Sequence, residues 1–528
     1  MGKIARYLNQ LTVGNVFDNP EILEAYSTDR SALKIKPKFV AFPESTDDIR
    51  KLMKFFNQLA TKNIEISVTP RGGGNDMGGA ALTNGIIIST EKLNRLLEID
   101  PREKLVRVQA GITLKELNTA LSVSGLVIPI GGHDNDTIGG LISNCPVDSG
   151  AEKYGGIQKY VERIEVVLPS GDCLQTNRFK KYILAKKAAE KTIEGAAYRK
   201  ISKLAHDKKE LFYDIDDSPH NLQGYPGIVR VVKKETMDLM PLFFGAQGTL
   251  GVISEVILKA TPLKHRPLRV AATFREIKPA IRYMKEIQSL KPENIDIYDL
   301  NIIMEAKETG KNLDGVVHKF DRGYVVFASF AERAANRIRK IIAMKSKYPR
   351  NTKFVFEKPE NRTTLNELEN SLANYLGYVK NGERVPILTD FYLPPYNLEN
   401  FLKDLEVLAE KLKLDLALYG SYATSIYSLR PKFDLSAEDY SKKATTFLRA
   451  GAYVIDRQGG TLVGGTPEGR LKAVVVNDKM PEAQKELYLE IKKIFDPNDI
   501  LNPNIKLGAK SKFTLTHFRS TNQPEIMI

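Results

Sequence analysis

The chain has 528 residues, of which 42% are hydrophobic and 27% charged, with a formal net charge of +14. These proportions are typical of a soluble globular protein, and the length predicts two domains of roughly 200 residues each. No apolar run reaches the ~20 residues of a membrane span and the first residues lack the apolar core of a signal peptide, so we expect a cytoplasmic protein. Cys145 and Cys173 are the only cysteines, which excludes a disulfide framework and an iron–sulfur cluster held by four thiolates.

The segment from about residue 34 to 264 alternates β-branched runs with glycine-rich turns. Two helical patterns lie between the runs: one starts at Thr46, a candidate N-cap, and one is capped by Thr113 and ends at Gly125. The helices are too few for a regular parallel sheet, so a mixed α+β domain is expected. The strand candidates are ISVTP, GIIIST, LVRVQAG, IEVVLPSG and GVISEVILKA.

Residues 178–209 carry eleven Lys and Arg against three acidic residues. Apolar side chains fall near helical spacing there, which predicts one or two basic amphipathic helices inside an insertion of about 176–236. The simplest interpretation is a solvated insertion, and the alternative is a contact with an anionic membrane surface or an acidic protein. Nucleic acid is not expected as a partner, because no recognised nucleic-acid module or aromatic stripe accompanies the charge.

After Pro262 the pattern changes to longer helices alternating with strands such as YVVFASF, so we place a domain boundary near 262–266. The helix candidates are REIKPAIRYMKEIQSL, ERAANRIRKIIAMKS, NLENFLKDLEVLAEKLKL and MPEAQKELYLEIKKIF. The turn DPNDILNPN follows the last helix.

Three glycine clusters interrupt the first domain. PRGGGNDMGGA at 70–80 contains five glycines, and PIGGHDNDTIGGLISN at 129–144 and FFGAQGTLGVISEV at 243–256 contain further ones. Clustered glycines let backbone N–H groups approach an anion. The first cluster is neither a P-loop, since Ala80 and Ala81 stand where Lys and Ser or Thr are needed, nor a dinucleotide fingerprint, since Met77 interrupts the glycine spacing. Three separated segments suit a long cofactor better than a single phosphate.

The order and spacing of these segments, with AGITLKELNTAL and ERIEVVLPSG, resemble the FAD-binding domain of the p-cresol methylhydroxylase/vanillyl-alcohol oxidase superfamily. The ending FDPNDILNPN resembles that of the FAD-linked oxidases, a group with D-lactate, glycolate and 2-hydroxyglutarate dehydrogenases. The resemblance implies an α+β fold: a two-part FAD-binding domain of p-cresol methylhydroxylase type and an α+β cap domain built on an antiparallel sheet. It implies a helical lead-in over 1–33, the FAD-binding domain over 34–264, the cap over 265–480 and a returning C-terminal segment over 481–528.

The resemblance also implies which residues hold FAD. Those matching the pyrophosphate loop, the adenosine and ribityl segment, the flavin-side backbone and the closing turn are Arg71, Gly72, Gly73, Gly74, Asn75, Asp76, Met77, Gly78, Thr137, Ile138, Gly139, Gly140, Ser143, Asn144, Gly248, Gly251, Val252, Ile253 and Asn502. Some relatives attach FAD through a histidine in the first glycine loop. Asn75 stands in that loop here and His133 is interpreted as a polar loop residue, so non-covalent FAD is expected.

The hydroxy-acid members of this group carry histidine motifs in the cap, and the matching stretches here are GSYATSIYSLRP and VGGTPEGRLK. Ser421 and Ser428 stand where two metal-binding histidines would be, Gly465 replaces a metal-binding Glu, and Thr466 replaces the histidine that takes the hydroxyl proton. Hydroxyls are poor ligands for a divalent transition metal and poor bases near neutral pH. No metal site is therefore expected.

The candidates for catalysis are the polar side chains that remain in these stretches. A tyrosine such as Tyr427, with its pKa lowered by a neighbouring cation, or Glu468, with its pKa raised by burial, would take the proton. Arg430 or Arg470 would hold a substrate carboxylate or phosphate.

We expect an FAD-dependent oxidoreductase that oxidises a C–OH substrate, which is an alcohol, a polyol, a sugar-derived molecule or a hydroxy acid, with oxygen or a separate carrier as electron acceptor. One alternative is a metal-dependent dehydrogenase of 2-hydroxy acids such as D-lactate. Another is a flavin-binding subunit with little activity of its own, which docks through 178–209.

Overall fold

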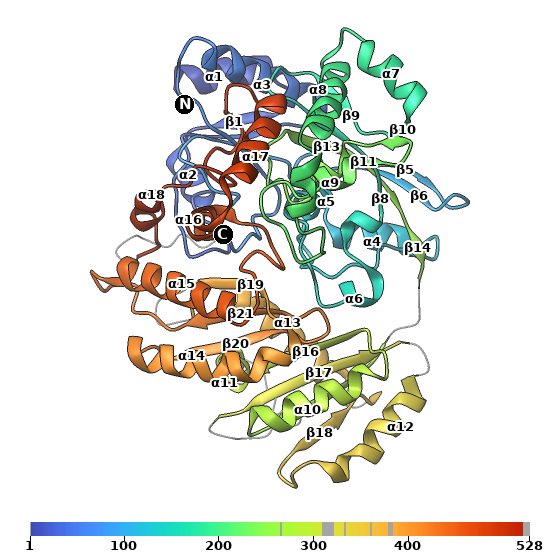
Figure 1. The fold of residues 1–528 in the computed structure, drawn as a ribbon, viewed down its shortest axis with the longest axis vertical. Coiled ribbons are helices and arrows are strands. Elements are labelled where there is room, and N and C mark those ends of the chain that lie inside the picture. Colours follow the sequence, from blue (N-terminus) through green and yellow to red (C-terminus); the bar gives the residue numbers. More distant parts are fainter. Residues whose placement is uncertain are drawn as a thin grey trace.

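The computed structural model describes residues 2–263, 267–308, 322–331, 334–359, 362–377 and 384–520. In Figure 1 the blue and green N-terminal half forms one part of the molecule together with the red C-terminal helices, and the yellow and orange middle of the chain forms the other. We call these the FAD-side part and the cap. The cap follows Pro262, as expected from the change of pattern.

The FAD-side part contains two main sheets. A mixed four-stranded sheet has the order β1-β2-β4-β3, with β2 and β3 both parallel to β4, and an antiparallel five-stranded sheet has the order β5-β6-β13-β8-β9. Their strands are β1 (Asn15–Phe17), β2 (Phe39–Phe42), β3 (Val68–Arg71), β4 (Ile86–Ser89), β5 (Leu96–Asp100), β6 (Leu105–Gln109), β8 (Val161–Val167), β9 (Cys173–Gln175) and β13 (Val252–Lys259). The glycine-rich loop 70–80 thus begins at the C-terminal end of β3.

Helices pack on these sheets through one apolar face each. In α3 (Thr46–Ala60), Ile49, Leu52 and Phe56 are buried at helical spacing, which is the pattern of a half-buried helix. Its N-cap is Ser45, one residue before the expected Thr46, and the Ser45 hydroxyl accepts from the Asp48 amide. The other helices of this part are α1 (Lys3–Leu11), α2 (Pro20–Ala25), α4 (Leu114–Ser122), α5 (Ile138–Asn144) and α6 (Ala151–Tyr154).

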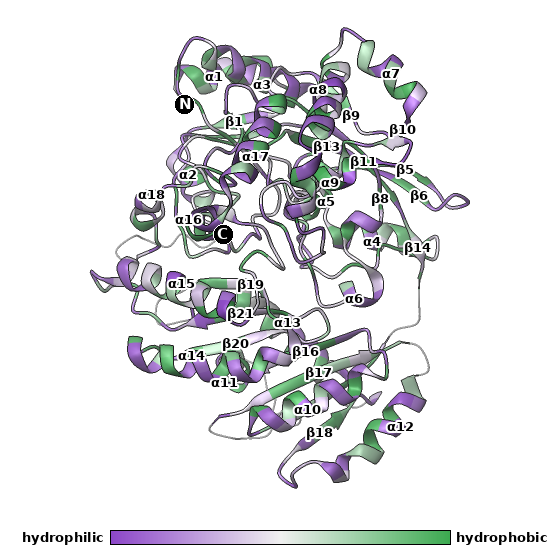
Figure 2. Cartoon of the chain, viewed as in Figure 1, coloured by the Kyte–Doolittle hydropathy of each residue, from purple (hydrophilic) through white to green (hydrophobic). Residues whose placement is uncertain are grey.

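The cap is built on a seven-stranded antiparallel sheet of order β18-β15-β17-β16-β20-β21-β19. Alternate residues of β17 enter two different cores: Val326 and Ala328 one, Val325 and Phe327 the other. Both faces of the sheet are therefore covered, as Figure 2 shows by the green colour of the strands and the purple outer sides of the helices. The strands are β15 (Leu268–Phe274), β16 (Asn294–Asp299), β17 (Tyr324–Phe330), β18 (Lys353–Phe356), β19 (Leu388–Tyr392), β20 (Leu416–Ser421) and β21 (Ile426–Pro431).

The helices of the cap divide between the two faces of the sheet. One face carries α10 (Ile277–Gln288), α14 (Leu398–Leu412) and α15 (Tyr440–Arg457), and the other carries α11 (Leu300–Glu308) and α13 (Arg362–Gly377). The helix α12 (Ala334–Met344) follows β17 along the chain. On the second face, the helix α13 lies toward the FAD-side part.

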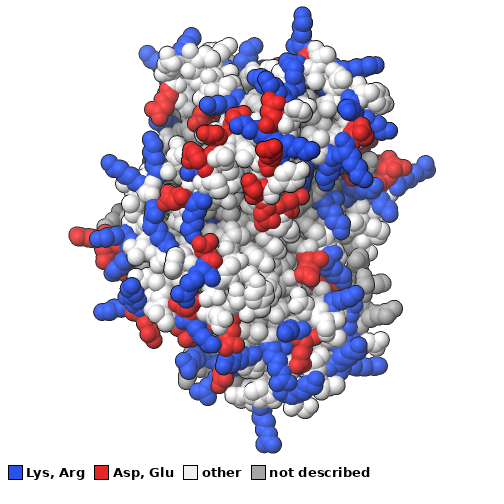
Figure 3. All heavy atoms as spheres, in the orientation of Figure 1, with Lys and Arg blue, Asp and Glu red and all other residues white. Residues whose placement is uncertain are grey.

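The basic segment separates into a core helix and an exposed one. In α8 (Ile193–Asp207), Tyr198, Ile201 and Leu204 are buried in the core of the FAD-side part, so this helix is structural. The helix α7 (Lys181–Ala189) has no buried residue and projects from the molecule (Figure 1). Figure 3 shows Lys and Arg side chains spread over this face, including the region of α7. A small sheet of β10 (Phe179–Lys180), β12 (Thr236–Met237) and β11 (Val232–Lys233), together with α9 (Ile228–Val231), completes the insertion.

The end of the chain returns to the FAD-side part. The helix α17 (Glu482–Phe495) buries Leu487, Tyr488 and Ile491 in the same core as α8. The Leu501 backbone then pairs with Val68 at the start of β3. The helices on either side are α16 (Gly469–Lys479) and α18 (Ser511–Thr516). The LNP turn is thereby placed directly behind the glycine-rich loop.

Candidate active site

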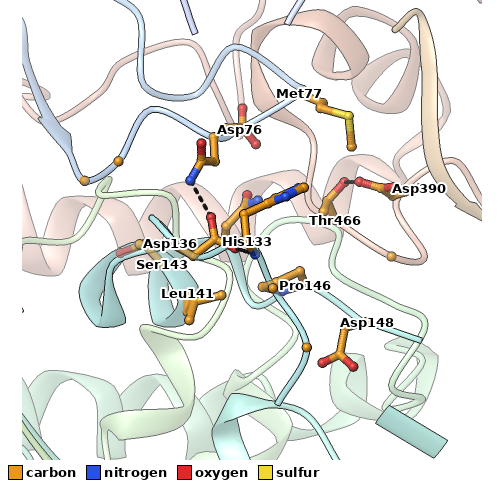
Figure 4. Close-up of a pocket in the computed structure, with 18 of the residues that line it drawn as sticks. Asp76, Met77, His133, Asp136, Leu141, Ser143, Pro146, Asp148, Asp390 and Thr466 are labelled. Atoms are coloured by element: carbon orange, nitrogen blue, oxygen red, sulfur yellow. Dashed lines mark hydrogen bonds between the residues drawn. The ribbon is translucent and has the colours of Figure 1, made fainter. Parts of the chain in front are cut away.

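A cavity of about 500 Å³ lies between the two parts. The three glycine segments line one side of it, and residues of β16, β19, β20, β21 and α13 line the other. Figure 4 shows side chains from both sides pointing into this space, with Asp76, His133 and Asp136 from the glycine segments and Asp390 and Thr466 from the cap end. The cavity therefore brings together residues more than 300 positions apart in the sequence.

The first two glycines of the loop 70–80 are required by a neighbouring loop. A Cβ on Gly72 would lie 2.1 Å from the Oγ1 of Thr137, and one on Gly73 would lie 2.3 Å from the carbonyl oxygen of Asn135. Gly74 has a φ of +68°, which an L side chain rarely adopts, and the Arg71 guanidinium packs beside it. Part of the demand for glycine thus comes from contact between two loops of the chain, a reason that the sequence pattern did not suggest.

Carboxylates hold these two loops in shape. The Asn75 amide donates to Asp136 Oδ1 (2.6 Å) and Asn135 Oδ1 (3.0 Å), and the other oxygen of Asp136 accepts from the His133 backbone N–H (2.7 Å). Asp76 accepts from the backbone N–H groups of Gly78 (3.0 Å) and Ala80 (2.6 Å). Burial and the positive charge of Arg30 lower the pKa of His133, which is neutral at pH 7 as a result.

The third glycine segment is fastened to the others through Gln247. Its amide donates to Asn144 Oδ1 (3.1 Å) and accepts from the Gly469 backbone N–H (3.1 Å). The Asn502 amide donates to the carbonyl oxygens of Gln247 (2.8 Å) and Ala80 (2.9 Å). Asn502 therefore joins the LNP turn to two of the glycine segments from behind.

Most of the residues that the resemblance assigned to FAD line the cavity. These are Arg71, Gly72, Gly73, Gly74, Asn75, Asp76, Met77, Thr137, Gly139, Gly140, Ser143, Asn144, Gly248, Val252 and Ile253. Gly78, Ile138, Gly251 and Asn502 are packed behind that surface: Gly251 against Val166, and Ile138 and Asn502 almost completely buried. Their contribution is to the shape of the cradle.

The cavity fits a long cofactor with a polar and an apolar end. Backbone of the glycine segments supplies polar groups close to the space, and Leu141, Pro146, Val147, Val252 and Ile253 supply an apolar wall. A phosphate-bearing chain needs the first surface and a flavin ring the second. The residues present therefore fit FAD.

At the cap end of the cavity, Asp390 is held by two hydroxyl groups. The Ser428 hydroxyl donates to Asp390 Oδ1 (3.1 Å) and accepts from the Asp390 backbone N–H (2.9 Å), while Thr466 donates to Oδ2 (3.1 Å). Asp390 has a φ of +50°, at an irregularity in the pairing of β19 with β21. A non-glycine residue in this conformation is strained, and such strain is concentrated at functional sites.

A buried ammonium group stands behind this carboxylate. Lys472, fully buried in α16, donates to the hydroxyl (3.0 Å) and the carbonyl oxygen (2.8 Å) of Thr466. Burial lowers the pKa of Lys472 to about 8, against the opposing effect of the negative charges of Asp390 and Asp76. Lys472 therefore donates to Thr466, and Thr466 in turn donates to Asp390.

Two further carboxylates line the cavity at this end. Asp148 accepts from the Gly150 backbone N–H (2.7 Å), and Asp296, on β16, accepts from the Asn294 side chain. Burial raises the pKa of both carboxyls, that of Asp296 to about 7 with a further contribution from Glu369 and Asp148. In Figure 4 Asp148 and Asp390 lie on the side of the cavity away from Asp76 and Ser143.

None of the four candidates for catalysis lies among the described residues that line the cavity. Tyr427 is completely buried in the cap core, and this burial raises the pKa of its phenol, whereas a lowered pKa was expected. Glu468 forms a buried ion pair with Lys506 (2.5 Å) and accepts from the Gly224 backbone N–H (2.5 Å). Through these two contacts, Glu468 joins Gly224 of the insertion to Lys506 of the C-terminal segment.

Most donors of the two arginines are bonded within the protein, and only the Nε of Arg430 has no hydrogen-bond partner. Arg470 donates to the carbonyl oxygen of Leu82 (2.7 Å) and to Asn502 Oδ1 (3.0 Å), and burial lowers its pKa to about 10. Arg430 lies against the Tyr419 ring, 5.7 Å from its centroid, and donates to the carbonyl oxygen of Leu376. Both therefore hold loops in place, and neither guanidinium faces the cavity.

The residues that sequence reasoning missed are Asp148, Asp296 and Asp390. Each is a single acidic residue with no motif around it. Asp390 alone carries a local signal, since it directly follows the mostly apolar run PILT. Its partners Ser428 and Thr466 are 38 and 76 positions away, so the cluster exists only in the folded chain.

The stretches that match the metal-binding motifs do not fit a metal. A Cβ on Gly465 would lie 2.5 Å from Ile426 and 2.8 Å from the Asp390 carbonyl oxygen, so no carboxylate side chain has room there. Ser421 donates to the Ile295 carbonyl oxygen. Among the residues that the structure describes, no group of three or more His, Cys, Asp and Glu side chains is arranged to hold a metal ion.

Comparison with known proteins matches both parts of the chain to families. Residues 37–177 match the FAD binding domain, and residues 268–505 match the C-terminal domain of FAD linked oxidases. The fold is similar to that of 4-ethylphenol oxidase from Gulosibacter chungangensis (TM-score 0.66, 15% identity, 93% of this chain and 94% of that one). It is equally similar to that of p-cresol methylhydroxylase (TM-score 0.66, 13% identity, 95% of each chain). The expected fold is confirmed.

Two curated relatives illustrate the range of sequence similarity. D-2-hydroxyglutarate dehydrogenase of Pantoea ananatis is 25% identical over 90% of this chain but only 48% of its own length. D-lactate dehydrogenase of Archaeoglobus fulgidus is 26% identical over 91% of this chain and 95% of its own. The chain spans about half the length of the first curated relatives it matches. Across the described residues, no helix is both long and apolar enough to cross a membrane.

Proposed function

Since this chain belongs to the FAD-linked oxidases of the p-cresol methylhydroxylase superfamily, we propose that it oxidises the C–OH group of a small molecule and that Asp390 receives the hydroxyl proton. The observation that carries this proposal is the position of Asp390 at the cavity wall, across from the glycine segments. An oxidation of this kind needs a group that takes the proton while the C–H bond is held toward the acceptor.

FAD, when bound, supplies a ring that accepts hydride. Backbone groups of the glycine segments would hold its phosphate-bearing chain, and Leu141, Pro146 and Ile253 would cover its apolar part. Residues of β20, β21 and α13 in the cap line the opposite side of the cavity.

The proton transfer rests on the hydrogen bonds of Asp390. Ser428 and Thr466 each donate to a different oxygen of the carboxylate, which fixes its plane and leaves a lone pair on each oxygen for a substrate hydroxyl. Lys472, protonated below about pH 8, supports the ionised form through Thr466. Asp390 can therefore accept a proton from the substrate oxygen.

A second candidate is the oxidation of a 2-hydroxy acid. Its support is the names of relatives: D-2-hydroxyglutarate dehydrogenase, D-lactate dehydrogenase and, in Bacillus subtilis, glycolate oxidase subunit GlcD. The cap of this chain has neither a metal site among its described residues nor an arginine that faces the cavity, which argues against such a substrate.

The test is an anaerobic screen of alcohols, polyols, sugars and hydroxy acids, in which bleaching of the flavin absorbance reports reduction. At least one C–OH compound should bleach the flavin, and Asp390→Asn should slow the bleaching while the FAD content stays unchanged. If no hydroxyl compound reduces the flavin, while another class of substrate does, C–OH oxidation is excluded.

The electron acceptor and the contact predicted for 178–209 stay predictions. The part of that segment available for a contact is α7, where Lys186 is exposed and Tyr182 is 66% exposed. The helix α8 is not available, because its apolar face is already buried.

A further inference from the structure

The cap end of the cavity is acidic. Carboxylates of Asp148, Asp296, Glu369 and Asp390 line it, and Glu369 is paired with Arg269 (2.5 Å). Among the described residues that line the cavity, the one Lys or Arg is Arg71 in the glycine loop. A substrate that enters beside Asp390 therefore meets carboxyl groups on several sides, of which Asp296, with its pKa raised to about 7 by burial, is partly protonated at neutral pH.

The cations Lys472, Arg430 and Arg71 each contact another part of the protein, and among them only the Nε atoms of the two arginines have no hydrogen-bond partner. Lys472 donates to Thr466 behind Asp390, and the Arg430 guanidinium lies behind the Tyr419 ring. Arg71 stacks on the Tyr26 ring, 4.8 Å from its centroid, and donates to the Tyr26 carbonyl oxygen (3.2 Å). Recognition of a carboxylate usually needs a bidentate arginine, and repulsion between like charges is strong at a site with little water. The described residues at this end of the cavity therefore present no Lys or Arg to a hydroxy-acid anion.

The same side chains suit hydroxyl groups. Asp148 accepts from the Gly150 and Gly131 backbone N–H groups, and Asp296 accepts from the side chains of Asn294 and Ser421, which leaves lone pairs on both carboxyl groups to accept from a ligand. Tyr298 and Tyr419 lie parallel at this wall, with ring centroids 6.3 Å apart and 8° between the planes. Aromatic faces of this kind accommodate the C–H groups of a hydroxylated carbon chain.

We infer that the substrate is an uncharged molecule with several hydroxyl groups, a polyol or a sugar, whose hydroxyls donate to Asp148 and Asp296. This inference rests on the proposed oxidation of a C–OH group. The geometry that carries this inference is the pair of oriented carboxylates beside Asp390, at an end of the cavity where the described lining residues include no lysine or arginine.

Equilibrium binding tests the inference without turnover. Xylitol, glucose, D-lactate and the amino alcohol serinol are titrated into the FAD-loaded full chain under anaerobic conditions, with saturation-transfer NMR as the readout. We expect xylitol or glucose to bind and D-lactate not to bind in the same concentration range. Tighter binding of D-lactate, or of serinol, than of both uncharged probes would overturn the inference.

Charge-removing variants separate recognition from damage to the fold. Asp148→Asn and Asp296→Asn together should weaken binding of the uncharged probe by about tenfold, because one acceptor oxygen of each carboxyl becomes an N–H₂ donor. They should strengthen binding of D-lactate, because carboxylate charge is removed. A damaged fold would weaken both. Asp207→Asn, on the exposed end of α8, is the matched control and should change neither affinity.

The outcomes keep the two proposals apart. If xylitol or glucose binds in this way but leaves the flavin oxidised, the inference about recognition stands and C–OH oxidation is in question. If D-lactate binds and bleaches the flavin, oxidation of a C–OH group stands and the inference about charge is overturned.

Discussion

Thr466 donates its hydroxyl hydrogen to the carboxylate of Asp390 across 3.1 Å, which joins the turn before α16 to the strand β19 at the wall of the cavity. Lys472 donates to the same Thr466 oxygen, so the hydroxyl links a buried ammonium group to a carboxylate at the cavity wall. The chain thereby builds a polar cluster at the cap end from an acid, two hydroxyls and a lysine, with no histidine in it.

Asp390→Asn should reduce the rate of flavin reduction by about 10²–10⁴-fold, the usual contribution of a general base. The amide keeps the size of the side chain but cannot take the proton. Stopped-flow absorbance with the substrate found in the screen measures the rate, and the absorbance spectrum measures the FAD content. Ser428→Ala, which removes one hydrogen bond to the carboxylate, is the matched control and should have a smaller effect. A wild-type rate in Asp390→Asn would remove Asp390 from the mechanism.

Gly72→Ala should destabilise the protein and weaken FAD binding, because the new Cβ would lie 2.1 Å from Thr137 Oγ1. We expect a loss of about 1–3 kcal/mol in the free energy of unfolding, as is typical of overpacking. The loss should be partly relieved in a Gly72→Ala, Thr137→Ala double variant, although Thr137→Ala alone removes the N-cap of α5 and costs about 1 kcal/mol. Urea unfolding and FAD titration measure the four proteins; strictly additive losses would contradict the contact.

Glu468→Gln should act on stability rather than on the rate per bound FAD. The change leaves the Lys506 ammonium buried without its carboxylate partner, and breaking such a pair typically costs about 3–5 kcal/mol. Removing both charges with Glu468→Gln and Lys506→Met should cost less than Glu468→Gln alone. Thermal unfolding measures stability and anaerobic flavin reduction measures the rate. A stable variant with a strongly reduced rate would return Glu468 to the role of catalytic base.

Asp296 should make the protein less stable as the pH rises from about 4 to about 7. The pKa of this carboxyl is raised to about 7 in the folded chain, so the folded state holds a proton that the unfolded state releases near pH 4. The stabilisation of the folded state by this proton is complete below about pH 4 and is lost as the pH rises to about 7. The groups that face it are Asp148 from the loop after α5, Glu369 from α13, and Tyr298 and Ser421 from the sheet.

Asp296→Asn should flatten this part of the stability profile, since the amide does not titrate. Urea unfolding of both proteins between pH 4 and 8 gives the two profiles. Parallel profiles would show that the Asp296 carboxyl does not keep its proton in the folded chain.

Acid precipitation should release the flavin into the supernatant. His133 donates its backbone N–H to Asp136, and its ring lies in the second glycine segment, so it does not stand in the first loop, where some relatives attach the cofactor. Cys145 is buried and burial raises the pKa of its thiol to about 12, which makes it a poor nucleophile. Yellow precipitate with a colourless supernatant would contradict non-covalent binding.

The local signals in the sequence predicted the elements well. The β-branched runs became β3, β4, β6, β8 and β13, and the capping residue Thr113 forms a full capping box with Glu116. Such signals act over a few residues, so a single sequence contains them. The glycine clusters indicated the FAD side of the cavity for the same reason, because each of them is a contiguous segment with a characteristic spacing.

The catalytic side of the cavity could not be read in this way. Glu468 and Arg470 are polar residues in a loop, and nothing near them in the sequence reveals the partners Lys506 and Asn502 that occupy them. Asp390 has no motif, and its importance follows from a left-handed conformation in β19 and from hydroxyls contributed by β21 and a distant turn.

The sequence by itself determined the two-part architecture, and the cofactor through the resemblance of its glycine segments to a known FAD-binding domain, because glycine spacing and alternating apolar residues express backbone needs that are local. Only the tertiary structure decided which acidic groups face the substrate and which cations are withdrawn from it. That outcome depends on the long-range pairing of strands and on burial, which settle whether a charged side chain is bonded within the protein or left to meet a ligand.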